Sequence, residues 1–283
     1  MNTGCEYKVS VIVPVHNRVD FVARALDSIY QQTLLPHEVI VIDDGSDDGT
    51  GPLIQQRYPS VIYRYQAKHG VSHARNRGIG LATGNWIALL DSDDQWQQDK
   101  LQKQVSALKK NQQYIICHSD EIWIRRGKRV NAMKKHRKQG GDIFYQCLEL
   151  CAISPSAVMI NRDYLLSIGL FDEDLPVCED YDLWLRICSS NLVLYVDEQL
   201  VIKHGGHADQ LSTQYWGMDR YRIAALEKLL SMQGLTSQQK QSTIHAILAK
   251  CRILCTGALK RKNYRIYAQY QQKLQRYSEA VIN

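Results

Sequence analysis

Short apolar runs alternate with amphipathic segments in the first part of the chain. Four runs rich in Val and Ile are typical of β-strands: Val9–Val15, Glu38–Asp43, Val61–Tyr65 and Trp86–Leu90. Between the first two, FVARALDSIYQQ carries apolar residues at helical spacing, and Asp20 is placed to cap that helix. The near-continuous apolar character of VSVIVPV, EVIVID and WIALL favours a mostly parallel sheet covered on both faces. The pattern therefore predicts an α/β fold with helices flanking the sheet.

The pattern changes near Tyr215, where long amphipathic helices replace the alternating runs. Breaks between these helices are expected near Gly234 and around Gly257–Asn263. At about 150 residues per domain, the 283 residues suffice for one large domain or two smaller ones. We expect an α/β domain over residues 1–214 and a helical C-terminal region over residues 215–283.

Charge is distributed unevenly along the chain. The formal net charge is +6, but residues 1–214 carry 23 basic and 26 acidic side chains, whereas residues 215–283 carry 12 and 3. The segment Arg125–Lys138 contains eight basic residues and no acidic one. Two interpretations stay open for these basic regions: a solvated surface, or attraction to anionic lipid or to a phosphate-bearing substrate at a membrane.

Cysteine spacing and hydropathy indicate the compartment. The eight cysteines include no CxxC pair and show no zinc-ribbon spacing, which favours reduced cysteines packed in the core. Apolar runs all fall short of the roughly 18 residues that cross a bilayer, and no basic leader precedes VSVIVPV. We therefore expect a cytoplasmic protein.

Acidic residues crowd the end of the fourth predicted strand in ALLDSDDQW. Asp91, Asp93 and Asp94 repel one another unless a cation binds there, and Mg²⁺ or Mn²⁺ prefers such oxygen ligands. A metal ion bridging these residues to a substrate diphosphate is one interpretation. The other is an acidic turn whose Asp caps a helix that begins near Gln98.

Two further motifs carry acidic residues. In VIDDGSDDGT, Asp44 ends the second strand, where a carboxylate can accept hydrogen bonds from a ribose hydroxyl or a base. In CEDYDLW, Glu179 and Asp180 open a helix near Cys178–Ser189. Acids in a first helical turn are also favoured by the helix dipole, so this motif alone does not indicate chemistry.

The motifs gain specificity in combination. VSVIVPVHNR, VIDDGSDDGT, GVSHARNRGIGLATG, IALLDSDDQW and CEDYDLWLR, in this order, resemble the inverting glycosyltransferases of family 2 over about residues 7–205. The resemblance implies a GT-A-like, Rossmann-related fold and a metal-dependent enzyme that uses a nucleotide sugar, with UDP as the nucleotide. Matching motif by motif, it assigns nucleotide contacts to Pro14, Asn17, Asp44, Arg75 and Asp91, metal contacts to Asp93, Asp94 and His204, and the catalytic base to Asp180.

The resemblance also implies how these groups act. Asp180 would deprotonate an acceptor hydroxyl on the face opposite the departing nucleoside diphosphate, and Mn²⁺ or Mg²⁺ would stabilise the charge on that leaving group. His204 lies in VIKHGGHADQLS, which we expect to be a flexible loop over the nucleotide. His207 competes for the same role, and either His could simply be solvated.

The biological setting follows from the resemblance as well. It implies a glycan or lipid-linked acceptor at the inner face of the plasma membrane, in bacterial surface-polysaccharide synthesis, with peripheral contact to anionic lipid. Nucleic acid is not an expected partner. Two other functions remain to be distinguished: a non-catalytic nucleotide-sugar-binding module, and a sugar-1-phosphate nucleotidyltransferase, whose GxGxRL opening is missing where VPVHNR stands.

Overall fold

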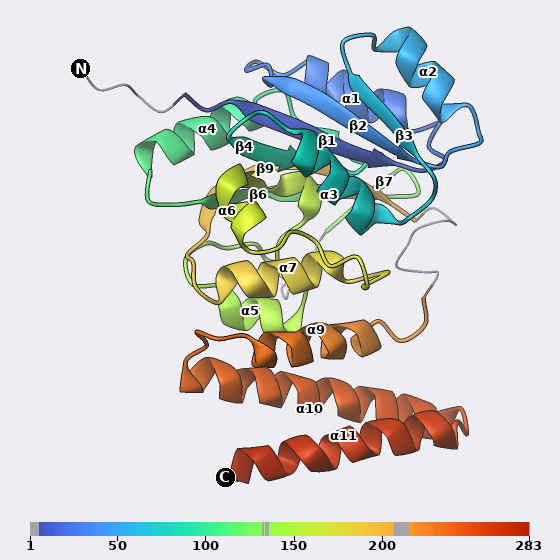
Figure 1. Cartoon of the computed structure of the whole chain (residues 1–283), viewed down its shortest axis with the longest axis vertical. Helices are drawn as coiled ribbons and strands as arrows, with labels where there is room; N and C mark the ends of the chain where they lie inside the picture. Colours follow the sequence, from blue (N-terminus) through green and yellow to red (C-terminus); the bar gives the residue numbers. More distant parts are fainter. Residues whose placement is uncertain (1–5, 132, 134–135, 207–214, 283) are drawn as a thin grey trace. The chain divides into compact units, whose positions relative to one another are not determined.

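The computed structural model describes residues 6–131, 133, 136–206 and 215–282 (Figure 1). The chain forms two compact units. The sheet unit comprises Met1–Gly141, Ile153–Pro176 and Leu192–His207. The helical unit comprises Asp142–Ala152, Val177–Asn191 and Ala208–Asn283, so the chain enters it three times.

The sheet unit is built on one sheet whose described residues form nine strands. Their bounds are β1 (Val9–Val15), β2 (Glu38–Asp44), β3 (Ile62–Gln66), β4 (Trp86–Leu89), β5 (Gln95–Trp96), β6 (Ile116–Arg125), β7 (Lys128–Val130), β8 (Met159–Asn161) and β9 (Leu194–Gly205). The spatial order is β3-β2-β1-β4-β8-β6-β9-β5, with β7 beside β6. The first four strands are parallel, β6 is parallel to β9, and the remaining pairs are antiparallel. The α/β class expected from the sequence is confirmed.

Helices cover both faces of the parallel half of the sheet. The helices of this unit are α1 (Val22–Tyr30), α2 (Thr50–Arg57), α3 (Val71–Leu81), α4 (Lys100–Lys110) and α6 (Arg162–Ser167). Val11 and Val13 of β1 belong to the core cluster that includes Leu26 of α1. Ile12 points the other way, toward Gly78 of α3. This alternation follows from the two-residue period of a strand and explains the continuous apolar run.

The start of α1 differs from the expectation. The predicted apolar stripe is buried, but the helix begins at Val22, and its N-cap residue Phe21 makes no side-chain capping bond. The proposed cap at Asp20 is therefore wrong. The Arg18 carbonyl accepts from the backbone N–H groups of Phe21 (2.9 Å) and Val22 (2.8 Å), so a backbone turn satisfies these donors instead.

The helical unit consists of five described helices: α5 (Phe144–Glu149), α7 (Glu179–Cys188), α9 (Asp219–Ser231), α10 (Ser237–Lys260) and α11 (Tyr264–Ile282). Within it, α7 packs on α5 and α9, and α10 packs on α9 and α11 (Figure 1). Thr236 and Gln239 form a reciprocal capping box at the start of α10. Trp184 of α7 is fully buried in this unit, as expected for a core residue.

Two sequence expectations concern cysteines and membrane spans. The seven described cysteines are thiols, and all are buried except Cys151, which is half-buried. Among the described helices, none is long and apolar enough to cross a membrane.

Candidate active site

Residues that the sequence singled out meet at one edge of the sheet unit. Pro14 is buried in β1 opposite Ile42 of β2, and Asp44 is the last residue of β2. Asp91 follows β4 by two residues. Because β1, β2 and β4 run parallel, their carboxyl ends lie at the same edge, which is where open α/β sheets bind ligands.

Asn17 links the two loops that follow β1 and β2. Its backbone is left-handed, with φ of 51°, a conformation that Asn tolerates better than most residues. Asn17 Oδ1 accepts from the Asp47 backbone N–H at 3.0 Å, and the Asn17 N–H donates to Ser46 Oγ at 2.9 Å. The side chain therefore fixes the shape of this edge.

Asp44 organises the turn between β3 and α3. Its buried carboxylate accepts from Gln66 Nε2 (2.7 Å), His69 N (2.8 Å) and Gly70 N (2.7 Å). Gly70 has φ of +98°, a backbone conformation that favours glycine. A substitution at Asp44 would therefore disturb the local turn as well as any ligand that the carboxylate holds.

Asp91 forms an ion pair with Arg75 of α3. Arg75 Nη2 lies 2.7 Å from Asp91 Oδ1, and the Arg75 side chain is only 4% exposed. The guanidinium also lies over the Phe171 ring, 5.1 Å from its centroid. Burial opposes the charged form of Asp91, but the positive charges of Arg75 and Lys203 outweigh it and lower the pKa of this carboxyl. Asp91 is therefore ionised at neutral pH.

The pKa values of Asp93 and Asp94 shift in the opposite direction to that of Asp91. Burial, reinforced by the charge of Asp91, raises the pKa of Asp93. Burial also raises the pKa of Asp94, with further contributions from Asp93 and Asp91 and an opposing one from Lys203. Without a ligand, the protonated forms of Asp93 and Asp94 are therefore favoured relative to that of Asp91.

Ser156 and the backbone of His204 orient Asp94. Ser156 Oγ donates to Asp94 Oδ2 at 2.6 Å and accepts from the Asp91 N–H at 3.1 Å. The His204 N–H donates to Asp94 Oδ1 at 3.1 Å. Trp96 Nε1 donates to the Ser156 carbonyl at 2.8 Å, so this buried indole supports the same serine. Sequence reasoning missed Ser156 because no motif marks the SPSA segment.

His204 lies in a different element from the one expected. It belongs to strand β9 and pairs with Ile124 of β6, so the expectation of a flexible loop at this position is wrong. The strand continues because β6 extends alongside it as far as Gly205. His207, the competing candidate, lies outside the described residues.

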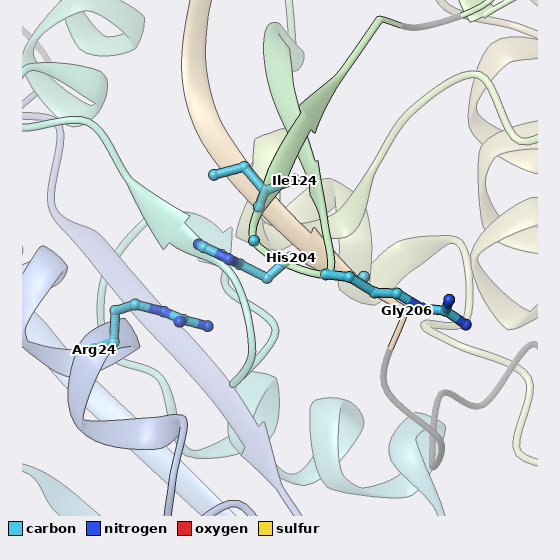
Figure 2. Close-up of a pocket in the computed structure, with 7 residues that line it drawn as sticks. Arg24, Ile124, His204 and Gly206 are labelled. Carbon is cyan, nitrogen blue, oxygen red and sulfur yellow. The ribbon is translucent and has the colours of Figure 1, made fainter.

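A cationic cavity adjoins the acidic cluster within the sheet unit. It has a volume of about 420 Å³, and its lining residues are Arg24, Ile124, Arg126, Gly127, His204, Gly205 and Gly206. Figure 2 shows the side chains of Arg24 on α1, Ile124 on β6 and His204 on β9 around it. Arg24 Nη2 donates to the Asp93 carbonyl at 2.8 Å, which places the cavity beside the acidic motif.

The acidic cluster suits a divalent cation in its chemistry. Among the described residues, no three His, Cys, Asp or Glu side chains are already arranged to hold a metal. Burial is the main cause of the raised pKa values of Asp93 and Asp94, with the charge of Asp91 adding to it, and a bound cation would favour their ionised forms. Oxygen donors of this kind are the ligands that Mg²⁺ and Mn²⁺ prefer.

Asp180 lies in the helical unit, in the first turn of α7. The N-cap residue Cys178 is left-handed, with φ of 64°, and Asp180 is half-buried. Asp180 Oδ1 accepts from the Tyr181 N–H at 2.7 Å, and Cys151 Sγ donates to Asp180 Oδ2 at 3.1 Å. The contact with Cys151 could not be anticipated, since 29 positions separate the two residues.

Comparison with known proteins decides the family. Residues 10–169, more than half of the chain, match the sequence profile of Glycosyl transferase family 2. The chain belongs to this family. Membership favours a glycosyltransferase over the nucleotidyltransferase and binding-module alternatives.

Relatives of this family 2 chain include bacterial proteins. A glycosyltransferase of Rickettsia felis is 34% identical over 196 residues, which cover 68% of this chain and 32% of that protein. The amylovoran biosynthesis glycosyltransferase AmsB of Erwinia amylovora is 29% identical over 62% of each chain. The Escherichia coli UDP-Glc:α-D-GlcNAc-diphosphoundecaprenol β-1,3-glucosyltransferase WfgD is 31% identical, over 66% of this chain and 72% of its own.

Solved structures show the same fold at low sequence identity. Staphylococcus aureus TarS 1–349, in complex with UDP-GlcNAc, has a TM-score of 0.66 at 15% identity, covering 95% of this chain and 92% of its own. The mannosyltransferase PcManGT of Pyrobaculum calidifontis, in complex with GDP-Man and Mn²⁺, has a TM-score of 0.60 at 17% identity, covering 97% and 87%. The expected GT-A-like fold is thereby confirmed.

Proposed function

We propose that this glycosyltransferase moves a sugar from a UDP-sugar to a hydroxyl of a glycan or lipid-linked acceptor, with inversion at the anomeric carbon and with Mn²⁺ or Mg²⁺ as cofactor. The observation that carries the proposal is the ion pair of the buried Arg75 with Asp91, beside Asp93 and Asp94 at the sheet edge. The names of the E. coli relative, which uses UDP-Glc, and of TarS, solved with UDP-GlcNAc, support the choice of nucleotide.

The donor would bind along the carboxyl edge of the sheet. Pro14 and Asn17 would contact the nucleotide, and Asp44 would contact its base. Arg75 and Asp91 would contact other parts of the nucleotide. Arginines suit phosphate because their planar guanidinium donates two parallel hydrogen bonds. The diphosphate would accordingly lie toward the cavity lined by Arg24 and Arg126.

Asp93, Asp94 and His204 would hold the divalent cation. When bound, the cation would neutralise the charge that develops on the leaving nucleoside diphosphate. Ser156 and the His204 N–H keep the Asp94 carboxylate in one orientation. Arg75 favours the ionised form of Asp91, and the pKa of the Asp91 carboxyl is accordingly lowered.

Asp180 would act as the general base. A carboxylate within hydrogen-bond reach of the acceptor hydroxyl takes up its proton as the oxygen attacks the anomeric carbon. Attack on the face opposite the leaving group inverts the configuration in a single displacement. The two hydrogen bonds to Asp180 fix its orientation for this step.

The acceptor would be presented at the inner face of the plasma membrane. In this proposal residues 1–214 carry the reaction, and residues 215–283 form a basic helical region that contacts anionic lipid. The diphosphoundecaprenol acceptor in the name of the E. coli relative supports a lipid-linked substrate in surface-polysaccharide synthesis.

A thermal-shift screen with UDP-sugars and other nucleotide sugars, with and without Mn²⁺, tests the donor and the metal together. A ligand that binds the native state raises Tm, so a UDP-sugar should raise it most, and EDTA should reduce the shift. Asp180→Asn should keep this shift but abolish UDP release from UDP-glucose in the presence of a lipid-linked acceptor. No Tm response to any nucleotide, or full transfer by Asp180→Asn, would contradict the proposal.

A further inference from the structure

A cysteine thiol is hydrogen-bonded to the carboxylate that we assign as the base. Cys151 Sγ donates to Asp180 Oδ2 at 3.1 Å, while Asp180 Oδ1 accepts from the Tyr181 N–H at 2.7 Å. Each carboxylate oxygen therefore has one fixed donor. Since a carboxylate offers about four acceptor positions, further positions remain for an acceptor hydroxyl.

The position of Cys151 relative to Asp180 is set by the packing of α5 on α7. Cys151 follows the end of α5, and the buried Tyr181 of α7 donates its hydroxyl to the Leu148 carbonyl of α5 at 2.7 Å. Lys250 of α10 donates to the Glu149 carbonyl at 3.2 Å, which satisfies another group at the same helix end. The backbone that leads into Cys151 is thus held by hydrogen bonds at Leu148 and Glu149.

We propose that Cys151 is a positioning residue for Asp180: its thiol holds one carboxylate oxygen of the base in a fixed orientation toward the acceptor. The inference rests on the proposed catalytic role of Asp180. A residue placed here could orient the carboxylate through any donor, but the strength of that donor matters. Arg or Lys would stabilise the ionised form strongly and make it a poorer base.

A thiol is a weak donor, which suits this task. It restricts the rotation of the carboxylate while withdrawing little of its affinity for a proton. Loss of the thiol should therefore impair the orientation of the base and lower kcat, while the KM for the donor should stay unchanged. These two consequences give the inference a signature that general destabilisation does not share.

Thiol alkylation tests the contact without any substrate. In the native protein the hydrogen bond to Asp180 engages the Cys151 thiol proton, and Asp180→Asn weakens that bond, so this variant should speed the reaction of Cys151 with iodoacetamide by roughly tenfold at fixed pH. Peptide mass spectrometry reads Cys151 separately from the other cysteines. In urea the two proteins should react equally. Equal native rates would show that the contact does not exist.

Steady-state kinetics of UDP release from UDP-glucose test the positioning role. Cys151→Ala should lower kcat roughly three- to tenfold with an unchanged KM for the donor. Cys151→Ser retains a donor and should restore kcat. If Cys151→Ala changes KM as much as kcat and Cys151→Ser does not rescue it, the residue is merely structural and the inference is wrong.

Cys147→Ala is the matched control in the same segment. Cys147 is buried, and its Sγ lies 3.9 Å from Cys188 Sγ, so this variant should lower Tm and leave kcat unchanged. Asp180→Asn separates the two proposals. Full transfer by that variant contradicts the base assignment, whereas an inactive Asp180→Asn combined with a wild-type kcat for Cys151→Ala contradicts only the positioning role.

Discussion

The Ser156 hydroxyl makes hydrogen bonds to both Asp91 and Asp94. Ser156→Ala removes the donor to Asp94 and leaves the Asp91 N–H without its acceptor. We expect a loss of about 1–3 kcal/mol in the free energy of unfolding and a smaller Mn²⁺-dependent Tm shift with UDP-sugar. Differential scanning fluorimetry and urea unfolding measure both effects.

Ser167→Ala is the control for that substitution. The Ser167 side chain is exposed and donates only locally, to the Tyr164 carbonyl of its own helix at 2.7 Å. Its loss should change stability by less than about 0.5 kcal/mol and leave the Mn²⁺ response intact. Equal behaviour of the two variants would show that Ser156 does not support the acidic cluster.

His118 makes the stability of the protein depend on pH. It is fully buried in β6, and its Nε2 lies 2.9 Å from the Gln139 carbonyl. Burial, with the nearby charge of Lys138, lowers its pKa from 6.5 to about 4. Below pH 6.5 the unfolded chain binds a proton that the folded protein does not, so stability falls from there to about pH 4.

His118→Gln keeps a donor for the Gln139 carbonyl but does not titrate. Its free energy of unfolding should lack this pH-dependent loss, which amounts to about 3 kcal/mol in the wild type. Urea unfolding at pH 7 and at pH 4 measures the difference between the two proteins, and contributions from unchanged groups cancel. Parallel pH dependences would contradict the assignment.

Local sequence identified only part of the candidate site. Asp91, Asp93 and Asp94 could be placed because they follow a strand whose apolar run is unmistakable. Ser156 and Cys151 could not, because their partners Asp91 and Asp180 are 65 and 29 positions away along the chain. Contacts of this kind depend on packing between elements, which one-dimensional periodicity does not contain.

At the scale of elements, α3 packs against β1 and β2 through a glycine. A Cβ atom at Gly78 would lie 2.5 Å from Ile12 Cγ2 and 3.3 Å from Ile42 Cγ1. Gly78→Ala should therefore push the helix away from the sheet and cost about 1–3 kcal/mol of stability. Since α3 carries Arg75, the Tm shift with UDP-sugar should shrink as well.

Gly80→Ala is the matched control on the same helix. A Cβ atom there meets nothing within 4 Å, so the better helix propensity of Ala should stabilise the protein by about 0.5–1 kcal/mol. Urea unfolding of both variants compares the two effects. The same sign for both would mean that α3 does not pack on the sheet at Gly78.

Strands can be predicted from the sequence where burial of both faces makes the apolar run continuous. Strands β1, β2 and β4 are predictable because all or nearly all of their residues are buried. The sequence predicts a loop rather than a strand at His204 because only Leu200 and Val201 are buried in the β9 segment LYVDEQLVIKHG. Its pairing with β6 holds it as a strand despite this weak pattern.

At the scale of the whole molecule, the excess of basic residues in the C-terminal region can be predicted from the sequence, but the clustering of their side chains in space cannot. The turn between α10 and α11 gathers four exposed basic residues: Lys260, Arg261, Lys262 and Arg265. Beside them, Leu259 and Tyr264 are 48% and 67% exposed. Basic residues next to an exposed aromatic ring suit the surface of an anionic bilayer, where the ring lies among the headgroups and the charges meet the lipid phosphates.

The protein should therefore sediment with vesicles that contain anionic phosphatidylglycerol at low salt, and less at high salt because screening weakens the attraction. Each basic residue near the surface contributes about 1 kcal/mol, so the double variant Lys260→Glu with Lys262→Glu should bind at least about tenfold more weakly. Lys240→Glu with Arg276→Glu makes the same charge change at the other end of the α10–α11 hairpin and should lose less. Equal losses would indicate attraction to net charge alone, and no sedimentation of the wild type would mean that these residues form a solvated surface.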